Sequence, residues 1–398
     1  MEVDRLEQEK EIKKKISIIT TTRAEYGILH PLIERCLKEE EFETQVLVTG
    51  THLSQKFGNT IEEIIQDGIP VFERIPILEE GEDAKSISKI MANTLLGFTD
   101  YFLREMPDFA VILGDRTELL GICGAAMNTG IPLVHLHGGE LTEGAVDDMV
   151  RHAVTKMSYL HFPSTEIYRR RIIQLGEEPD RVFNVGALGI ENIKRERLWS
   201  KEELKASVDF DFTHPYVLVT YHPETLEDQS IEEQLEALLE AMDIRSSYHY
   251  LITKANSDQG GEKINRMLES YGADRENVKV VSSLGRKRYL SAVPHSEFVL
   301  GNSSSGLIEV PALAVPTVNI GDRQRGRIQP DSVISCGHSV EEILKAMDQA
   351  QEMREEYRQG IRCADTTFGD GNTSEKIVEI LKEKLSRKTD LKKQFYDW

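Results

Sequence analysis

The chain has 398 residues, and its 48 Lys and Arg residues against 68 Asp and Glu residues give a formal net charge of −20 at pH 7. Two domains are the natural expectation at this length. A surface this acidic argues against nucleic acid or an anionic membrane as a partner. The sequence holds no apolar run of the roughly 20 residues that span a bilayer, and no stretch typical of a signal peptide.

The four cysteines indicate a compartment. Cys36, Cys123, Cys336 and Cys363 lie far apart and show no CxxC spacing. Such single cysteines favour a reducing compartment over a disulfide framework, and they argue against a zinc cluster. We therefore expect a cytoplasmic protein without a structural metal.

The first half of the chain alternates between short β-branched runs and longer helical patterns. After a charged extension at residues 1–14, we expect strands at residues 15–20, 44–50, 109–115, 133–138, 159–163 and 182–185. Helical patterns occupy residues 24–39, 61–67, 84–105 and 118–128. Strands separated by helices predict βαβ units and a parallel sheet.

A second alternation follows a charged, turn-rich segment, residues 196–214, which we interpret as a linker. Strands are expected at 216–221, 248–253, 278–281, 298–300 and 316–320, with helices at 231–242, 263–271 and 286–292 and a mostly helical stretch at 339–384. We predict an α/β protein with Rossmann-like domains at 15–195 and 215–375 and a C-terminal helix or tail at 376–398. Two doubly wound domains joined by a linker place a cleft between their strand ends, as in the GT-B fold.

Polar side chains follow the first two predicted strands. Residues 21–27 open a helix, whose free N–H groups suit an anion, and Arg23 adds a planar charge that suits phosphate. His52, after the second strand, is expected to face the same crevice. A capped helix with a solvated arginine is the plainer interpretation of Arg23. The absence of a GxGxxG pattern disfavours a dinucleotide.

The segment from His135 to His152 is the most informative part of the sequence. It follows an apolar strand and contains several histidines, acids, two adjacent glycines and an arginine. A fold gains little from so many titratable groups at a strand end unless chemistry uses them. Asp115 ends the preceding strand and adds a carboxylate, although it also suits a helix cap.

Two side-chain pairs follow if a helix begins near Ala145. Asp147 and Arg151 then lie four residues apart on one face, as do Asp148 and His152. One pair is a structural ion pair and the other faces the cleft, and the sequence leaves open which is which. An aspartate held by an arginine stays ionised at neutral pH.

A Gly- and Ser-rich segment marks the second domain. Residues 301–306 follow a predicted strand, and small residues before a helix N-terminus let a backbone approach a phosphate closely. Glu309, in the next turns, suits ribose hydroxyls, although a serine-rich turn is the plainer alternative. His222, Asn256 and Arg323 follow other strands of this domain and extend the predicted nucleotide rim.

Together these motifs resemble the hydrolysing UDP-N-acetylglucosamine 2-epimerases of bacterial sialic-acid and legionaminic-acid synthesis. The matching pieces are residues 22–27, 114–116, 135–140 with Asp147, Asp148, Arg151 and His152, 222–225, 301–306 with Glu309, and 319–324. They occur in the order seen in the family. The resemblance implies the GT-B fold and neither a metal nor a redox cofactor.

The resemblance also implies the reaction UDP-GlcNAc + water → ManNAc + UDP. A base removes the C2 proton, UDP leaves from C1, and water adds to the resulting 2-acetamidoglucal. Asp115, Glu140 and Asp147 are placed as the acid/base set, with His137 and Arg151 beside them. Some family members carry a glutamate where His137 stands, so the division of labour among these groups is open. The implied substrate and nucleotide contacts are Arg23, Gly27, His52, His222, Asn256, Ser303, Ser304, Ser305, Gly306, Glu309 and Arg323.

Three alternatives remain at this stage. A sibling group acts on UDP- or GDP-linked N,N'-diacetylbacillosamine, and the motifs do not separate the two sugars. A GT-B glycosyltransferase would share the nucleotide site without needing the acids, and a nucleotide-sugar-binding protein with an inactive site is the third. The resemblance further implies a homodimer or homotetramer. Residues 84–105 are a candidate interface, although an intramolecular core helix explains them equally well.

Overall fold

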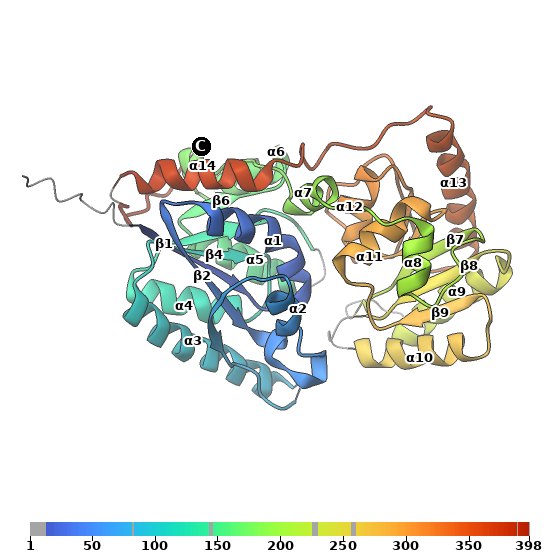
Figure 1. Ribbon diagram of the computed structural model, residues 1–398, viewed down its shortest axis with the longest axis horizontal. Coiled ribbons are helices and arrows are strands. Elements are labelled where there is room, and N and C mark those ends of the chain that lie inside the picture. Colours follow the sequence, from blue (N-terminus) through green and yellow to red (C-terminus); the bar gives the residue numbers. More distant parts are fainter. Residues whose placement is uncertain are drawn as a thin grey trace, which may run out of the picture.

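A computed structural model describes residues 13–81, 83–142, 146–224, 230–255, 260–387 and 389–397. These residues form two six-stranded parallel sheets, each with helices on both faces (Figure 1). The predicted α/β architecture of two Rossmann-like domains is confirmed.

The first sheet has the strand order β3-β2-β1-β4-β5-β6. Its strands are β1 (Lys14–Thr20), β2 (Phe42–Thr49), β3 (Val71–Ile75), β4 (Phe109–Leu113), β5 (Leu133–Leu136) and β6 (Leu160–Phe162). The helices between and after them are α1 (Arg23–Lys38), α2 (Ile61–Gln66), α3 (Ala84–Glu105), α4 (Leu119–Thr129), α5 (Val146–Met157) and α6 (Glu166–Gln174). Helix α1 begins after Thr22, whose hydroxyl accepts a hydrogen bond from the Glu25 N–H at 3.3 Å.

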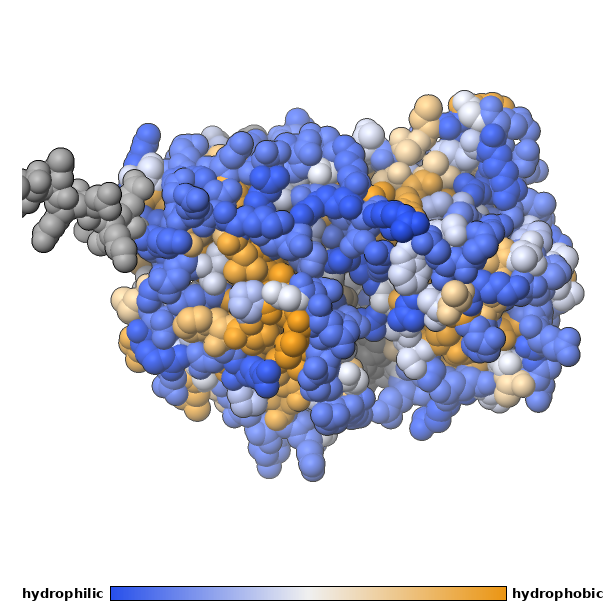
Figure 2. All heavy atoms as spheres, in the orientation of Figure 1, coloured by the Kyte–Doolittle hydropathy of each residue, from blue (hydrophilic) through white to orange (hydrophobic). Residues whose placement is uncertain are grey.

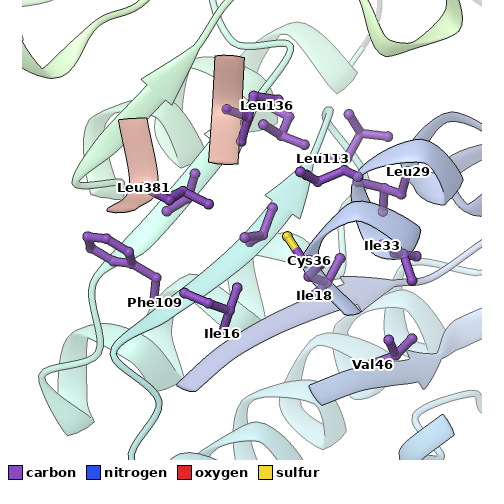
Figure 3. Packing of buried hydrophobic residues seen from close by; sticks show 14 of the residues in the cluster. Ile16, Ile18, Leu29, Ile33, Cys36, Val46, Phe109, Leu113, Leu136 and Leu381 are labelled. Carbon is purple, nitrogen blue, oxygen red and sulfur yellow. The ribbon is translucent and has the colours of Figure 1, made fainter. Parts of the chain in front are cut away.

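Alternate side chains of this sheet pack on opposite faces. Ile18 of β1 lies in the same apolar cluster as Leu29 of α1, whereas Ile19 packs with Phe98 of α3. Both faces are covered, which explains why the central strands are buried along most of their length. Leu381, far away in the sequence, completes the cluster around Ile18 (Figure 3).

The second sheet has the order β12-β11-β10-β7-β8-β9. Its strands are β7 (Tyr216–Thr220), β8 (His249–Thr253), β9 (Val278–Val281), β10 (Val299–Gly301), β11 (Thr317–Ile320) and β12 (Val333–Cys336). The remaining helices are α7 (Leu188–Arg195), α8 (Lys201–Ser207), α9 (Ile231–Ile244), α10 (Gly261–Ala273), α11 (Gly285–Ala292), α12 (Ser305–Ala312), α13 (Val340–Arg358) and α14 (Thr373–Leu385). Helix α13 packs on the second sheet, and the chain then crosses back so that α14 covers the first.

Four local expectations differ from the structure. Residues 182–185 are not a strand, since only an isolated bridge joins Val182 to His161. The edge strands β3 and β12 were not expected, because most of their side chains are part-buried or exposed and give no apolar run. Residues 196–214, interpreted as a linker, contain α8 and bury Leu204 and Phe212 against the second sheet.

The strand orders define where a ligand site is expected. Each sheet reverses its direction of winding between two neighbouring strands, β1 and β4 in the first and β7 and β10 in the second. Ligands of doubly wound proteins bind in the crevice beyond the carboxyl ends of such strands. A ligand site is therefore expected at the loops that follow these four strands, residues 21–23, 114–116, 221–224 and 301–304.

The described surface is predominantly hydrophilic. In Figure 2 the side chains seen on this face are mostly polar, and hydrophobic residues gather mainly on the N-terminal half. Within the described ranges, no helix combines the length and the apolar character needed to cross a membrane.

The position of α14 yields a stability prediction. Leu381 is fully buried in the first core, so we expect Leu381→Ala to lower the free energy of unfolding by about 2–5 kcal/mol. Ile361→Ala, at an exposed position, is the control and should change it by less than about 0.5 kcal/mol. Urea unfolding measures both, and equal effects of the two substitutions would contradict the packing of α14.

Candidate active site in the interdomain cleft

The loop after β5 folds back on itself and brings two titratable side chains together. His137 has a φ of 61° and Gly139 a φ of 79°, both in the left-handed region. Such a backbone costs a non-glycine residue roughly 1 kcal/mol and is typical of functional sites. The turn brings His137 Nδ1 to 2.9 Å from Glu140 Oε1.

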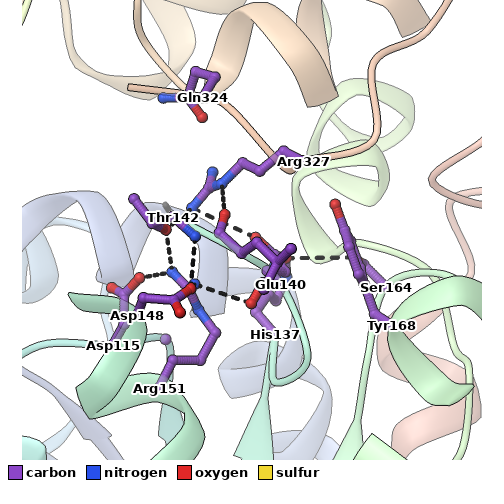
Figure 4. Close-up of polar contacts among 12 residues, drawn as sticks. Asp115, His137, Glu140, Thr142, Asp148, Arg151, Ser164, Tyr168, Gln324 and Arg327 are labelled. Atoms are coloured by element: carbon purple, nitrogen blue, oxygen red, sulfur yellow. Dashed lines mark hydrogen bonds and ion pairs between the residues drawn. The ribbon is translucent and has the colours of Figure 1, made fainter. Parts of the chain in front are cut away.

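Glu140 is 4% exposed and lies at the centre of the polar network in Figure 4. Ser164 Oγ donates to Glu140 Oε1 at 3.4 Å, and Arg327 Nη2 lies 3.7 Å from Oε2. Burial raises the pKa of Glu140, but the His137 hydrogen bond and the Arg327 charge outweigh it, so the pKa lies below its usual range. Glu140 is therefore a buried carboxylate that stays ionised at neutral pH.

Arg151 of α5 links this loop to the end of β4. Its side chain is 1% exposed and forms an ion pair with Asp115. It also donates to the Glu140 carbonyl oxygen at 3.2 Å and to Thr142 Oγ1 at 2.9 Å. The predicted residues Asp115, His137, Glu140 and Arg151 therefore lie together in the structure.

The aspartate that joins this network from α5 is Asp148. Its Oδ1 accepts the Thr142 N–H at 2.8 Å and lies 3.7 Å from Arg151 Nη1, and its Oδ2 lies 3.4 Å from His152 Nε2. Asp147, the predicted catalytic residue, is the preceding, half-buried position of the same helix turn. The pairing of Asp148 with Arg151 at i,i+3 shifts the expected helical face by one residue.

Two predicted histidines make structural contacts. His52 lies between Thr20 Oγ1 at 3.0 Å and Thr60 Oγ1 at 2.8 Å, and burial lowers its pKa to about 4. His135 lies 2.8 Å from the Gly114 carbonyl oxygen, and burial lowers its pKa to about 3. Both rings are neutral at physiological pH and connect neighbouring strand ends.

The strand ends of the second sheet meet at Asn302 and Glu224. Asn302 accepts the His222 N–H at 2.7 Å and donates to Glu224 Oε1 at 3.1 Å, while Glu224 Oε2 accepts the Asp322 N–H at 3.0 Å. Arg323 Nη1 donates to the Asn302 carbonyl oxygen at 3.0 Å. These contacts fix the loops after β7, β10 and β11 against one another.

His222 carries an unused polar atom into this cluster. The residue is buried, and its Nδ1 has no hydrogen-bond partner within the described residues. Burial, with the Arg323 charge as a second cause, lowers the pKa of His222 to about 3. A neutral ring with a free nitrogen can bind a ligand there.

The Ser- and Gly-rich loop leads directly into α12. Ser303 precedes the helix, Ser304 is its N-cap residue and Ser305 its first residue. Gly306 packs so closely on Thr317 of β11 that a side chain would overlap it. Glu309 lies on the same helix against Gly189 of α7, and burial raises its pKa to about 7. The predicted nucleotide residues of this segment therefore share one helix end.

Arg23 reaches from the first half to the second. Its Nη2 donates to Ser283 Oγ at 2.6 Å, and its Nε lies 3.0 Å from Glu63 Oε1. Gly27, on the same helix, accepts a hydrogen bond from Asn192 at its carbonyl oxygen. Asn256, predicted to bind the nucleotide, lies outside the described residues.

Two residues of the site, Arg327 and Glu224, were not among the predicted site residues. Arg327 crosses the cleft and donates from Nε to the Leu141 carbonyl oxygen at 3.0 Å. The signal was present, since Arg325-Gly326-Arg327 is a basic run in an acidic chain, directly after a strand-end motif. Among the residues that the structure describes, no cluster of three or more His, Cys, Asp or Glu is arranged for a metal ion.

Comparison with known proteins agrees with this geometry. The profile of the UDP-N-acetylglucosamine 2-epimerase family matches residues 34–382. The chain belongs to this family. The family resemblance inferred from the motifs is thereby confirmed.

Curated relatives and solved structures extend the comparison. The chain is 37% identical to the GDP/UDP-N,N'-diacetylbacillosamine 2-epimerase (hydrolyzing) of Campylobacter jejuni, over 97% of this chain and 99% of the relative. It is 36% identical to polysialic acid biosynthesis protein P7 of Escherichia coli, over 96% and 97%. The crystal structure of UDP-GlcNAc 2-epimerase from Neisseria meningitidis superposes with a TM-score of 0.78 at 19% identity, covering 93% of this chain and 100% of that one. The fold is thus that of the 2-epimerases.

Glu25, in the first turn of α1, is a buried acid at the first switch point. Glu25 Oε2 accepts hydrogen bonds from the Thr21 N–H and Thr21 Oγ1, both at 2.8 Å. Burial, with the charge of Glu118 as a second cause, raises the pKa of Glu25 from 4.5 to about 7. The folded protein therefore holds a proton that the unfolded chain loses within this range.

This difference predicts a pH-dependent stability. As pH rises from 4.5 to 7, Glu25 should lower the free energy of unfolding by about 1.4 kcal/mol per pH unit. Glu25→Gln should remove that slope, and the exposed control Glu40→Gln should keep it. Denaturant unfolding at several pH values measures the difference, and parallel curves for wild type and Glu25→Gln would refute it.

Proposed function

We propose that this protein is a hydrolysing 2-epimerase that converts UDP-N-acetylglucosamine and water into N-acetylmannosamine and UDP. The supporting observation is the opposition of two sites across one cleft. The Asp115, His137, Glu140 and Arg151 cluster lies at the strand ends of the first sheet, and the α12 helix end lies at those of the second. A nucleotide sugar needs both: a phosphate-binding helix end and acid/base groups at its sugar ring.

The first chemical step requires a base at the C2 proton. Glu140 suits this role because it is ionised yet buried, and His137 at 2.9 Å can pass the proton on. Proton removal from C2 and departure of UDP from C1 give the 2-acetamidoglucal. Water then adds at C1, and a proton returns to C2 from the other face.

Asp115 is proposed as the second acid/base group. Its carboxylate is held by Arg151, which also holds the Glu140 carbonyl, so the two carboxylates keep a fixed spacing. Fixed spacing is what proton transfer on opposite faces of one sugar carbon needs. We keep Asp147 in the proposed set and add Asp148, because Asp148 contacts Arg151 directly.

The nucleotide is assigned to the second half. Ser303, Ser304 and Ser305 offer backbone N–H groups at the start of α12, and Glu309 offers a carboxylate for ribose hydroxyls. The Gly306 N–H donates to the Ser303 carbonyl oxygen, so Gly306 is proposed only as the residue that lets the backbone approach the ligand closely. His222 and Arg323 flank them, and Arg23 reaches across from the first half. The proposed contacts also include Gly27, His52 and Asn256.

A second substrate is supported by one of the relatives. The Campylobacter jejuni protein is named for GDP/UDP-linked N,N'-diacetylbacillosamine, whereas the E. coli relative is named for polysialic acid biosynthesis. The same acid/base chemistry serves both sugars, since each carries a 2-acetamido group. A cytoplasmic location completes the proposal, supported by four unpaired cysteines.

The first test is proton NMR of the purified protein with UDP-GlcNAc in D2O, without an acceptor. We expect released UDP and N-acetylmannosamine that carries deuterium at C2. Asp115→Asn and Glu140→Gln should each lower kcat by about a hundredfold or more, while Glu166→Gln, at an exposed position on α6, should not.

The alternatives give different results in this assay. Turnover only of UDP- or GDP-linked diacetamido sugars would select the second substrate. Intact substrate in every case, with UDP bound, would contradict the epimerase and favour a transferase or a binding protein.

We also propose that the protein is a homo-oligomer assembled through α3. Leu96 and Leu103 are 65% and 62% exposed, and their spacing of seven residues places them on one helix face. Met106, the residue that caps the end of α3, and Met127 of α4 are exposed as well. An apolar face of this kind is costly in water and suits a second copy of the chain.

The oligomer predicts the effect of a charge on this face. Leu96→Glu with Leu103→Glu should shift the mass measured by light scattering to that of the monomer, because a buried carboxylate opposes association. Ile361→Glu, exposed on another part of the surface, is the matched control. An unchanged mass in the double variant would place the interface elsewhere.

A further inference from the structure

The loop between β11 and β12 docks on the opposite half at two consecutive residues. Arg327 donates from Nε to the Leu141 carbonyl oxygen at 3.0 Å and from Nη2 to Thr142 Oγ1 at 3.2 Å. The next residue, Ile328, donates its N–H to the hydroxyl of Tyr168 at 3.1 Å. The Arg327 side chain is 12% exposed, so these contacts are largely shielded from water.

Arg327 thus holds the loop that carries Glu140 by hydrogen bonds. Figure 4 shows its guanidinium above Thr142 and Glu140, on the side opposite Arg151. The backbone and side chain of this loop are therefore held from both directions: by Arg151 from within the first half and by Arg327 from the second. If the halves separate, Arg151 keeps its contacts and those of Arg327 are lost.

The same loop contacts the proposed nucleotide site. Arg323 Nη1 and Gln324 Nε2 both donate to the Asn302 carbonyl oxygen, at 3.0 and 2.8 Å. Asn302 directly precedes the serines at the start of α12. Residues 323–328 therefore connect the proposed nucleotide site to the acid/base site.

We infer that Arg327 is a positioning residue that makes the acid/base loop complete only when the two halves are docked. It holds residues 140–142 from the opposite half and does not itself exchange a proton with the sugar. The inference rests on the proposed function. It adds that occupation of the nucleotide side and assembly of the acid/base side are mechanically coupled through residues 323–328.

The charge of Arg327 provides a readout beyond folding. The groups facing Glu140 are His137 on its own loop, Arg151 on α5, Tyr168 on α6, Glu309 on α12 and Arg327. Arg327 lowers the pKa of Glu140, so its removal must raise that pKa. The limb of the pH–rate profile that reports Glu140 then moves to higher pH, whether Glu140 acts as base or as acid.

The test compares Arg327→Ala with Arg325→Ala. Arg325 lies on the same loop, is exposed, and pairs with Asp322 at 3.0 Å. For Arg327→Ala we expect kcat to fall about a hundredfold, as a misplaced catalytic group does, with the UDP dissociation constant changed less than about threefold and the pH limb shifted upward. Arg327→Lys should recover part of kcat, and Arg325→Ala should resemble wild type.

A second measurement does not need turnover. Hydrogen exchange of residues 137–142 with UDP present should be faster in Arg327→Ala, and in Tyr168→Phe, than in wild type, while exchange of the β4 core is unchanged. An unchanged exchange rate, or a loss of UDP affinity as large as the loss of kcat, would overturn the inference. If wild type turns over no nucleotide sugar, the proposed function fails, yet the exchange experiment still decides the role of Arg327.

Discussion

The candidate site depends on one buried guanidinium. Arg151 forms an ion pair with Asp115 beyond β4, binds the Glu140 carbonyl and the Thr142 hydroxyl beyond β5, and lies on α5, which follows that loop. Moving an arginine out of water costs several kcal/mol unless its donors are satisfied. Burial lowers the pKa of Arg151 to about 9, so the guanidinium is still charged at neutral pH. Asp115 and Asp148 therefore stabilise α5 by pairing with its buried Arg151.

In the second half, the neutral side chain of Asn302 connects the loops as the charged Arg151 does in the first. Its side-chain amide is hydrogen-bonded to the backbone of His222 and to Glu224, and its backbone carbonyl oxygen accepts from Arg323. An amide both donates and accepts, so it can connect three loops without bringing an unpaired charge into the cluster. A cluster without excess negative charge suits the nucleotide binding that we propose for this half. The two halves thus share a topology while differing in the electrostatics of their strand ends.

Much of this arrangement followed from the sequence. Apolar runs ending in polar residues located the central strands, and with them the strand ends that Asp115, Glu140 and the serines before α12 follow. The edge strands β3 and β12 were not predicted, because many of their side chains are exposed and their apolar pattern is weak. Local patterns describe what a single strand buries, and these two bury little.

Other features could not be predicted from local patterns. The contact of Asp148 with Arg151 depends on the rotation of α5, which packing sets and spacing does not. Arg327 acts on residues 185 positions away in the sequence, and no local pattern carries that information. The ring contacts of His52 and His135 with hydroxyl and carbonyl groups likewise depend on the packing of neighbouring strand ends.

The return of α14 to the first sheet has a consequence for synthesis. The chain crosses between the halves twice, and the crossings touch where the Ala187 N–H donates to the Phe368 carbonyl oxygen at 2.8 Å. Ile377, Val378, Leu381 and Leu385 of α14 fill a core whose other buried members end at Leu188. When the ribosome has synthesised the first half, part of the apolar surface of that half is still uncovered. About 190 further residues must then be synthesised before α14 can cover it. The N-terminal half folds to completion last, although it is made first.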